Sequence, residues 1–590
     1  MTVCRVRPDL PALDRVFDYL VPDGSEVVLG TIVRVPLQGR SVRGWVVETD
    51  VDSDTAPERL RPLNKVVGAG PPAELLALAA WAAWRWAGTV VAFLRVASPE
   101  NSVTPPVTPV APPVASPVGP SVVRVHRWPP ASPRGGLVTS LIADVGSTVV
   151  VLADARRTGA LVRALAATGR EVVVLRSDQS AAERTRAWRR SVAGDCVVVG
   201  GRTAVWAPVP DLAAVVVLDE GDEALKEERA PAWHARDVAI ERARRVGARV
   251  ELVTPAPTLD AIVAADDVLR PSRPDERGGW SVVEVVDRRE EPPGVGLLTI
   301  PLGDALRRAL TAGRAVCVLN RKGRARLLAC VACGELTRCE ACGAAVIETD
   351  TGLLSCPRCS TTRPKVCLHC HATRMKAVRP GIAKLRDDLS ALLPRASIAE
   401  VEAGTAEIPP ADVLVGTEAV LHRVPGDPAR PVRLVAFLDA DQELLAPRVH
   451  AAEQALWLMV RAARLVGPRT GPGRILIQTR VPDHEVIEAV RHGDPEVVRV
   501  PEETRRRDLG YPPFGGLAEV SGAAAAVDAL VAALRGVEGI RVLGPVEAGA
   551  GKRALAQAAG VAELCDALAG SARDARGHGR LRVEVDPLRV

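Results

Sequence analysis

The chain has 590 residues, and at roughly 150 residues per domain it is long enough for about four domains with buried cores. Its hydrophobic fraction of 47% and charged fraction of 25% are those of a globular protein, which excludes a chain that is disordered throughout. A net charge of +5 is too small to indicate a polyanionic partner by itself, so any nucleic-acid function has to rest on particular sites.

The N-terminal part of the chain shows strand patterns and no export signal. Its first residues, MTVCRVRPDLPALDRVFDYL, lack the uninterrupted apolar run of a secretory signal, so we expect a cytoplasmic protein. Short β-like runs such as EVVLGTIVRVPL and RGWVVETDV follow, separated by Gly and Pro, and predict a β-rich domain. The apolar stretch from Leu75 to Leu94 is long enough to span a bilayer, but Arg85 near its middle favours a buried helix that breaks near Gly88.

Beyond this helix the composition changes twice. The stretch SVTPPVTPVAPPVASPVGPS is rich in proline, which favours extended conformations over a packed core. After it, β-branched runs (TVVVLA, EVVVLR, CVVVG, AAVVVLD, RVELVT) alternate with Ala- and Arg-rich helical stretches, a pattern typical of a parallel sheet covered by helices on both faces. A second series, with AVCVLN before a cysteine-rich block and DVLVG, RLVAFLD and RILIQT after it, predicts a second lobe that contains the block as an insertion.

The whole pattern predicts an α/β protein with smaller domains at both ends. The final residues contain an Ala-rich helix, a second helix and a strand-like end, which together fit a small α+β domain. The expected boundaries are a β-rich domain at 1–70, a helix and proline-rich linker at 71–133, a first lobe at 134–275, a second lobe at 276–327 and 374–500, a double zinc-binding module at 328–373 and a C-terminal domain at 501–590.

The cysteine-rich block holds eight of the twelve cysteines, as four Cys-x-x-Cys pairs between Cys330 and Cys370. The pairs are separated by five, thirteen and seven residues, and their eight thiolates are enough for two tetrahedral metal sites. A site closed by four sulfurs has no open position, so we expect two structural zinc ions, with His369 and His371 left over. The spacing leaves open which pairs share an ion, and the alternatives are redox thiols or one zinc ion with spare cysteines.

The residues around this block resemble a known family. LNRKGRARLLACVACGELTRCEAC, residues 319–342, is similar to the segment that leads into the cysteine block of the bacterial replication-restart family PriA (primosomal protein N′). RVFDYLVPDG and GTIVRVPL resemble the family's DNA 3′-end-binding domain, and WHARDVAIERAR, DVLVGTEAV, VAFLDAD, RILIQT and YPPFGG resemble later segments in the same order. The resemblance covers nearly the whole chain and implies two RecA-like lobes of the superfamily 2 helicase type.

The resemblance also implies how the cysteines are shared. In the family the outer two pairs hold one ion and the inner two pairs the other, in a module that contacts DNA and other primosome proteins. Carried over, the first zinc site is Cys330, Cys333, Cys367 and Cys370, and the second is Cys339, Cys342, Cys356 and Cys359.

Two further sets of residues are candidates for DNA contacts. The family's pocket for a 3′-terminal nucleotide implies roles for Phe17, Asp18 and Tyr19, because an aromatic ring can stack on a base and a carboxylate can accept a hydrogen bond from the 3′-hydroxyl. Core aromatics beside a turn aspartate are the alternative interpretation. Basic residues next to the zinc module are candidates for phosphate contacts, against a merely solvated basic face. They are Arg321, Lys322, Arg324 and Arg326.

The motifs of an ATP-driven helicase are altered. No lysine occurs between Lys65 and Lys226, and the chain has no Gly-x-x-x-x-Gly-Lys-Ser/Thr segment to hold the nucleotide phosphates. The acidic motif reads VVVLDEGDE, so Asp219 and Glu220 would form a vestigial nucleotide site or simply face solvent at a strand end. The family's Ser-Ala-Thr motif has become VTPAPTLD, its final arginine-rich motif has become LWLMVRAARLVGPR, and most of its winged-helix segment is missing.

These features predict a replication-restart protein that binds branched DNA at stalled forks and is not an enzyme. The partners implied by the resemblance are forked DNA, other primosome proteins, single-stranded-DNA-binding protein and the machinery that loads the replicative helicase, in the cytoplasm at the nucleoid. We expect two structural zinc ions as cofactors, and the altered motifs argue against a role for ATP and Mg²⁺. The alternatives are an active 3′-to-5′ DNA helicase with an unusual nucleotide site and a zinc-ribbon protein that acts on RNA.

Overall fold

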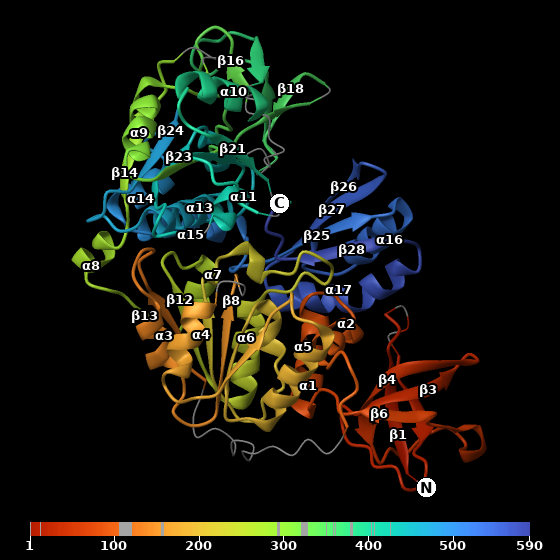
Figure 1. The fold of residues 1–590 in the computed structure, drawn as a ribbon. Coiled ribbons are helices and arrows are strands. Elements are labelled where there is room, and N and C mark those ends of the chain that lie inside the picture. The colour runs from red at the N-terminus through yellow and green to blue at the C-terminus, as the bar shows by residue number, and fades with distance from the viewer. Residues whose placement is uncertain are drawn as a thin grey trace.

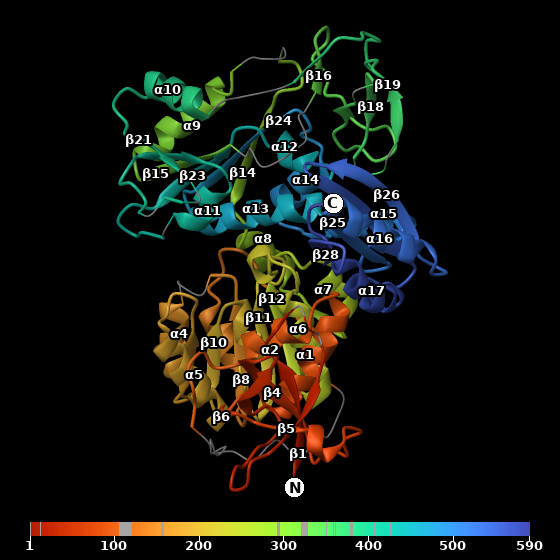
Figure 2. The ribbon, with the colours of Figure 1, turned by 90° about the vertical axis from the view of Figure 1, so that its right-hand side faces the viewer.

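The computed structural model describes residues 2–11, 13, 15–104, 121–154, 158–291, 296–319, 328–349, 351–357, 359, 361–377, 382–402, 404–405, 407–424 and 426–590. Most of the proline-rich stretch predicted as a linker lies outside these residues. So do the four basic residues predicted to contact DNA phosphates, Arg321, Lys322, Arg324 and Arg326. Two α/β lobes lie one above the other, with the C-terminal domain beside their junction and the N-terminal domain at the far end of the first lobe (Figures 1 and 2).

The N-terminal domain is a six-stranded sheet of order β5-β2-β1-β4-β3-β6, so the predicted β-rich domain is confirmed. Alternate side chains of its strands, such as Val33 and Val35 of β3, point to one side and form its core. Its elements are β1 (Val3–Pro8), β2 (Phe17–Leu20), β3 (Ile32–Leu37), β4 (Arg40–Thr49), η1 (Pro57–Arg59), β5 (Arg61–Pro62) and β6 (Lys65–Gly68).

Two helices, α1 (Ala73–Arg85) and α2 (Val90–Ala97), connect this domain to the rest of the molecule. They are buried, as the charge at Arg85 predicted, and the break falls between them. The ring of Phe93 packs against Trp86 and against Trp206 of the first lobe, with centroid distances of 6.3 Å and 5.6 Å. Within the described part of the chain, no helix has the length and apolarity needed to cross a membrane. The side chains of α1 and α2 belong to the buried core that continues into lobe 1.

Lobe 1 is a fully parallel seven-stranded sheet of order β13-β7-β12-β11-β8-β10-β9. The sequence pattern placed the start of this lobe at residue 134, but its strand β7 (Val123–Arg127) lies earlier in the chain. The pattern missed β7 because the polar, alternating run VRVHR is not typical of a buried parallel strand. The other elements are α3 (Gly135–Leu141), β8 (Ser147–Leu152), α4 (Gly159–Ala166), β9 (Val172–Leu175), α5 (Ala181–Ala193), β10 (Val197–Gly200), η3 (Arg202–Trp206), β11 (Leu212–Leu218), η4 (Glu223–Leu225), α6 (Ala235–Val246), β12 (Arg249–Thr254), α7 (Leu259–Ala264) and β13 (Asp267–Leu269).

Lobe 2 follows α8 (Arg273–Gly278) and is a parallel six-stranded sheet of order β14-β24-β23-β15-β22-β21. One face packs on α9 and α10 and the other on α11 and α13 to α15, which leaves the strands buried on both sides. The elements are β14 (Val282–Asp287), α9 (Ile300–Leu310), β15 (Arg314–Val318), α10 (Ile382–Leu392), β21 (Ile398–Val401), β22 (Val413–Gly416), α11 (Ala419–Arg423), β23 (Val432–Phe437), α12 (Asp441–Leu444), α13 (Ala451–Val466), β24 (Arg474–Thr479), α14 (Glu485–His492) and α15 (Glu496–Leu509).

The cysteine-rich module is inserted between β15 and α10 of lobe 2, as predicted. It contains β16 (Leu328–Cys330), β17 (Ile347–Glu348), β18 (Leu353–Ser355), β19 (Thr362–Pro364) and β20 (Met375–Ala377). The C-terminal domain is a βαββαβ unit with sheet order β26-β27-β25-β28, so the expected α+β domain is confirmed. It contains β25 (Gly516–Gly522), α16 (Ala524–Arg535), β26 (Arg541–Ala548), β27 (Gly551–Ala558), α17 (Val561–Arg576) and β28 (Leu581–Val585).

Candidate functional sites

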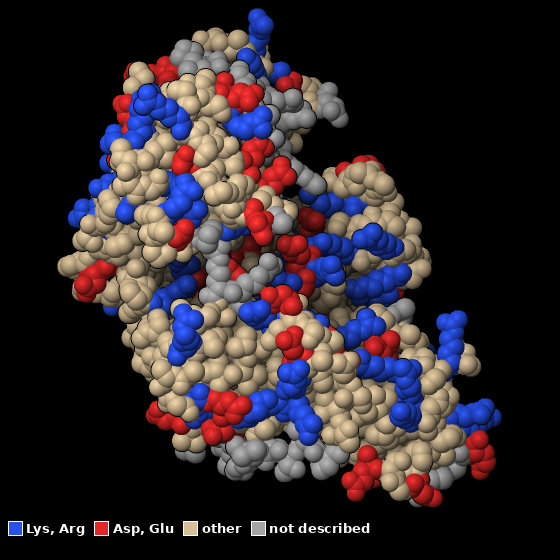
Figure 3. Space-filling model, in the orientation of Figure 1, with Lys and Arg blue, Asp and Glu red and all other residues tan. Residues whose placement is uncertain are grey.

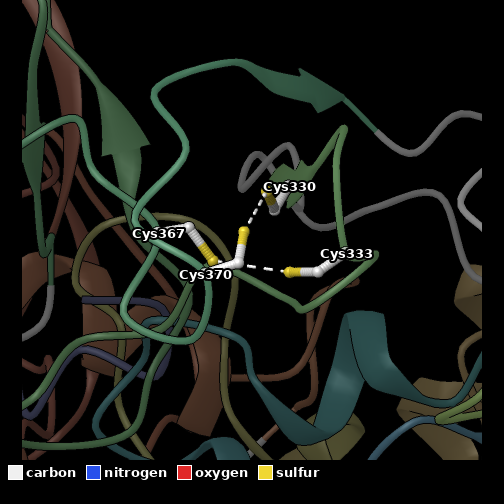
Figure 4. Close-up of side chains that lie close together, drawn as sticks. All are labelled: Cys330, Cys333, Cys367 and Cys370. Atoms are coloured by element: carbon white, nitrogen blue, oxygen red, sulfur yellow. Dashed lines mark hydrogen bonds between the residues drawn. The ribbon is translucent and has the colours of Figure 1, made fainter.

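The eight cysteines of the module gather into two groups of four thiols, each able to hold a metal ion. These are the same nested groups that the family resemblance implies. In the outer group the Sγ atoms of Cys330 and Cys370 lie 3.5 Å apart, and those of Cys333 and Cys367 lie 3.6 Å apart (Figure 4). In the inner group the Sγ atoms of Cys339 and Cys359 lie 3.4 Å apart, and those of Cys342 and Cys356 lie 3.5 Å apart.

Three of the four Cys-x-x-Cys turns share a backbone form, and the matching residue of the fourth, 360, lies outside the described residues. The residue four positions after the first cysteine donates its N–H to that cysteine's carbonyl, at 3.0 Å from Gly334, 2.9 Å from Gly343 and 3.0 Å from His371. All three donors have a positive φ, of 80°, 72° and 60°, which the two glycines adopt at no steric cost and which His371 adopts as a non-glycine residue. The turn brings both thiols of a pair to one side. Four sulfurs at such spacings match a closed tetrahedral zinc shell with Zn–S bonds of ~2.3 Å, so the donor set fits zinc.

The module has a small apolar core and is attached to lobe 2. Its buried cluster consists of Leu328, Ala344, Val346 and Leu354 with two of the ligand cysteines. The backbone N–H of Ala345 donates to the carbonyl of Leu445 at the end of α12, at 2.8 Å. The two metal sites are therefore held against the second lobe rather than on a free arm.

The three residues implicated in 3′-end binding lie on β2, with different exposure. Asp18 accepts hydrogen bonds from Arg5 at 2.8 and 3.2 Å and from the Ser53 hydroxyl at 2.7 Å, and the Arg5 bonds hold the pKa of its carboxyl below the ordinary value. Tyr19 is only 4% exposed and donates its hydroxyl to the Pro36 carbonyl at 3.3 Å. Tyr19 therefore belongs to the domain core, contrary to the expectation that it offers a stacking face. Phe17 is half-buried.

Asp219 follows β11 and contacts two arginines. Arg464 of α13 donates to both of its carboxylate oxygens, at 2.6 Å to Oδ1 and 2.8 Å to Oδ2. Arg134, immediately before α3, donates to Oδ2 at 2.6 Å. Burial alone would raise the pKa of Asp219, but the two guanidinium groups outweigh it and lower the pKa to about 2. The carboxylate is thus ionised and bound on both oxygens by the protein itself.

Glu220 is fully buried and holds a different segment. It accepts hydrogen bonds from the backbone N–H and the hydroxyl of Thr258, both at 2.8 Å, and from Arg236 at 3.2 Å. Burial raises the pKa of its carboxyl despite these partners. Thr258 belongs to the VTPAPTLD segment, so Glu220 joins the strand end to that segment instead of facing solvent.

The surroundings of Asp219 come from both lobes. Arg461 of α13 pairs with Asp222 at 2.9 Å, and Trp457, one turn earlier, packs on the backbone at Gly221. Beside them is a cavity of about 400 Å³ lined by leucines of both lobes together with Arg134, Arg461 and Arg464. Sequence reasoning located the altered arginine motif LWLMVRAARLVGPR but not the partners of its arginines, and it did not identify Arg134. Its position between a strand and a helix, where a phosphate-binding loop would lie, was the available signal.

Comparison with known proteins gives matches at both ends of the chain and along its length. Residues 5–99 match the model of the PriA 3′DNA-binding domain, and residues 507–588 match that of the primosomal protein N C-terminal domain. The probable replication restart protein PriA of Mycobacterium tuberculosis strain H37Rv is 29% identical over 92% of this chain and 90% of its own length. Replication restart protein PriA of Bacillus subtilis is 27% identical over 60% of this chain, and the match spans 46% of that protein.

Solved structures give weaker matches. RecG bound to a three-way DNA junction covers 66% of this chain and 47% of its own, with 11% identity and a TM-score of 0.34. Yeast Dbp5 bound to RNA and ADP BeF3 covers 66% of this chain and 90% of its own, with 11% identity and a TM-score of 0.33.

Proposed function

Because the chain belongs to the PriA family of replication restart proteins, we propose that it binds branched DNA at stalled forks and supports primosome assembly without hydrolysing ATP. The DNA-binding part is supported by the match of residues 5–99 to the family's 3′DNA-binding domain. The part that concerns ATP is supported by the binding of Asp219 to Arg464 and Arg134.

ATP hydrolysis in this fold needs a lysine on the phosphates and a carboxylate that holds Mg²⁺. Here the loop before α3 has no lysine, and Arg134 in that loop donates to Asp219. A cation at Asp219 would have to displace Arg464 and would then lie beside the guanidinium of Arg134, at the cost of like-charge repulsion. The residues of this cleft therefore do not fit a Mg²⁺–ATP complex, and no catalytic step is assigned to them.

The DNA end is proposed to meet the N-terminal domain at β2. Phe17 is the one aromatic of the three with exposed surface, so it is the candidate for stacking on the terminal base. Asp18 retains its Arg5 and Ser53 partners and would accept the 3′-hydroxyl with its remaining lone pairs. Basic and acidic side chains alternate over much of the visible surface, and the hollow between lobe 2 and the C-terminal domain has acidic side chains toward the lobes and basic ones toward the C-terminal domain (Figure 3).

The zinc module is proposed to hold two structural ions and to offer the contacts to DNA and to primosome proteins that the family resemblance implies. Single-stranded-DNA-binding protein and the loading machinery for the replicative helicase are the partners proposed on the same ground. The fit of both thiol groups to a closed tetrahedral shell supports the structural role.

The test is binding of the zinc-loaded protein to a fork whose nascent strand ends at the junction in a 3′-hydroxyl or in a 3′-phosphate. We expect tighter binding to the hydroxyl end, and Phe17→Ala should weaken it by about ten- to a hundredfold because stacking is worth ~1–3 kcal/mol per base. Leu10→Ala, at an exposed apolar side chain of the same domain, is the matched control. Equal binding to both ends, unaffected by Phe17→Ala, would refute the proposed end recognition.

A further inference from the structure

One contact between the two lobes is formed by one face of α13 against one acidic turn. Trp457, Arg461 and Arg464 are spaced four and three residues apart, so they lie on one side of the helix. They meet the turn from Asp219 to Asp222 through the two ion pairs described above and through the Trp457 ring. The guanidinium of Arg464 also lies 5.9 Å from the centroid of that ring.

We propose that this contact locks the two lobes together in the absence of nucleotide, so that α13 takes the place of a ligand in closing the cleft. The proposal rests on the proposed function, in which the cleft performs no hydrolysis, and adds that its lobes do not open and close. The chain would then be a rigid DNA-binding scaffold.

A second group of contacts joins the lobes away from the cleft. The backbone N–H of Leu259, in α7 of lobe 1, donates to Glu453 of α13 at 2.8 Å. Arg506 of α15 is 1% exposed, pairs with the same Glu453 at 2.5 Å and lies 3.6 Å from Asp260 of lobe 1. Separating the lobes would break the hydrogen bond from Leu259 to Glu453 and the pair of Arg506 with Asp260, whereas Arg506 and Glu453, both in lobe 2, would stay paired.

A third contact comes from the segment that follows β28. Arg589 pairs with Glu223 of lobe 1 at 2.7 Å. The carbonyls of Leu588 and Val590 accept hydrogen bonds from the Gln454 side chain, at 3.1 Å, and from the backbone N–H of Val449, at 2.7 Å. This segment therefore binds both lobes at once, on the side next to the C-terminal domain.

The helix and the turn are in close contact at Gly221. A Cβ atom placed on Gly221 would lie 2.1 Å from Nε1 of Trp457, so helix and turn are at their closest approach. Asp219 and Asp222 are 10% and 9% exposed at their side chains, so salt screens these pairs weakly. These three contacts, together with the pairs of Arg127 in β7 with Asp494 and Glu496 of lobe 2, would have to break before the lobes could part.

Hydrogen exchange of the full-length, zinc-loaded protein tests the lock. Peptides that contain the Asp219–Asp222 turn and α13 should exchange at the same rate with and without Mg²⁺–ATP. Arg461→Ala with Arg464→Ala should raise exchange of the turn by at least ~10-fold, as expected if a local opening becomes easier by more than 1.4 kcal/mol. Arg491→Ala, which removes an exposed pair with Glu488 on α14, is the matched control and should change neither peptide.

The opposite outcomes separate this inference from the proposed function. Altered exchange on adding Mg²⁺–ATP to the natural protein, without phosphate release in the same sample, would overturn the lock and leave the non-hydrolysing role standing. Unchanged exchange in the double variant would also overturn it. Phosphate release with no change in exchange would refute the proposed function alone. Since the first comparison uses the natural chain, the inference stays testable even if the double variant folds poorly.

Discussion

Removal of zinc should unfold the cysteine-rich module and leave lobe 2 intact. The module's buried cluster contains three large aliphatic side chains, Leu328, Val346 and Leu354, whose burial contributes ~1.5–3 kcal/mol each. Structural zinc contributes ~10–16 kcal/mol per site in small domains, more than all three side chains together. The module should therefore lose its structure with the metal, whereas both faces of the lobe 2 sheet keep their helices and their cores.

The assay is metal release by a chelator, followed by limited proteolysis of the full-length chain. We expect two zinc ions per chain, and new cleavage between Cys330 and Cys370 once they are removed. Cys356→Ser should reduce the content to one ion. Cys317→Ala is the control, because this buried thiol of β15, whose pKa burial raises to about 12, lies in the lobe 2 core and should leave both ions bound. Protection of the metal-free module, or two ions in Cys356→Ser, would refute the reasoning.

Three further predictions concern stability. Burial lowers the pKa of His234 to about 3, so below pH 6.5 the unfolded chain binds a proton that the folded chain does not. The free energy of unfolding should therefore fall by ~2 kcal/mol from pH 7 to pH 5. His234→Asn, which keeps the helix cap, should remove that part of the pH dependence when unfolding by urea is measured. Gly221→Ala should lower the melting temperature by several degrees, because the added methyl would meet the Trp457 ring, and an unchanged melting curve would contradict the close packing. Trp45→Ala should lower the free energy of unfolding by ~3–5 kcal/mol and make the N-terminal domain sensitive to proteolysis. The reason is that this buried ring packs on α1 and α2 and donates a hydrogen bond to Ser98 at 2.8 Å. Resistance to proteolysis equal to that of the natural chain would contradict this packing.

The sequence predicted the fold class well because its signals are local. Continuous β-branched runs indicate buried parallel strands wherever they occur, and Cys-x-x-Cys pairs indicate metal sites from spacing alone. The polar strand β7 escaped this reasoning because its residues alternate, although it is paired on both sides in the sheet. Which cysteine pairs share a site also required the tertiary structure or the family resemblance.

The cleft could not be predicted in the same way, because its chemistry depends on partners distant in sequence. Asp219 and Arg464 are 245 residues apart, and no local pattern shows that they meet. Tyr19 illustrates the converse: its motif suggested a binding role, but its side chain is buried in the core of the N-terminal domain, against which Phe17, on the same face of β2, packs only in part. The missing lysine was visible in the sequence, whereas the interaction of Arg134 with Asp219 was not.

The most direct test of the central claim is ATP hydrolysis by the purified, zinc-loaded protein on a fork with a 3′ end at the junction, with binding to that fork measured in the same sample. The account predicts tight fork binding with no phosphate release above the rate without protein. Clear DNA-stimulated hydrolysis that Asp219→Ala abolishes would contradict it, and would mean that a cleft without the phosphate-binding lysine, whose carboxylate is bound by two arginines, can still hydrolyse ATP.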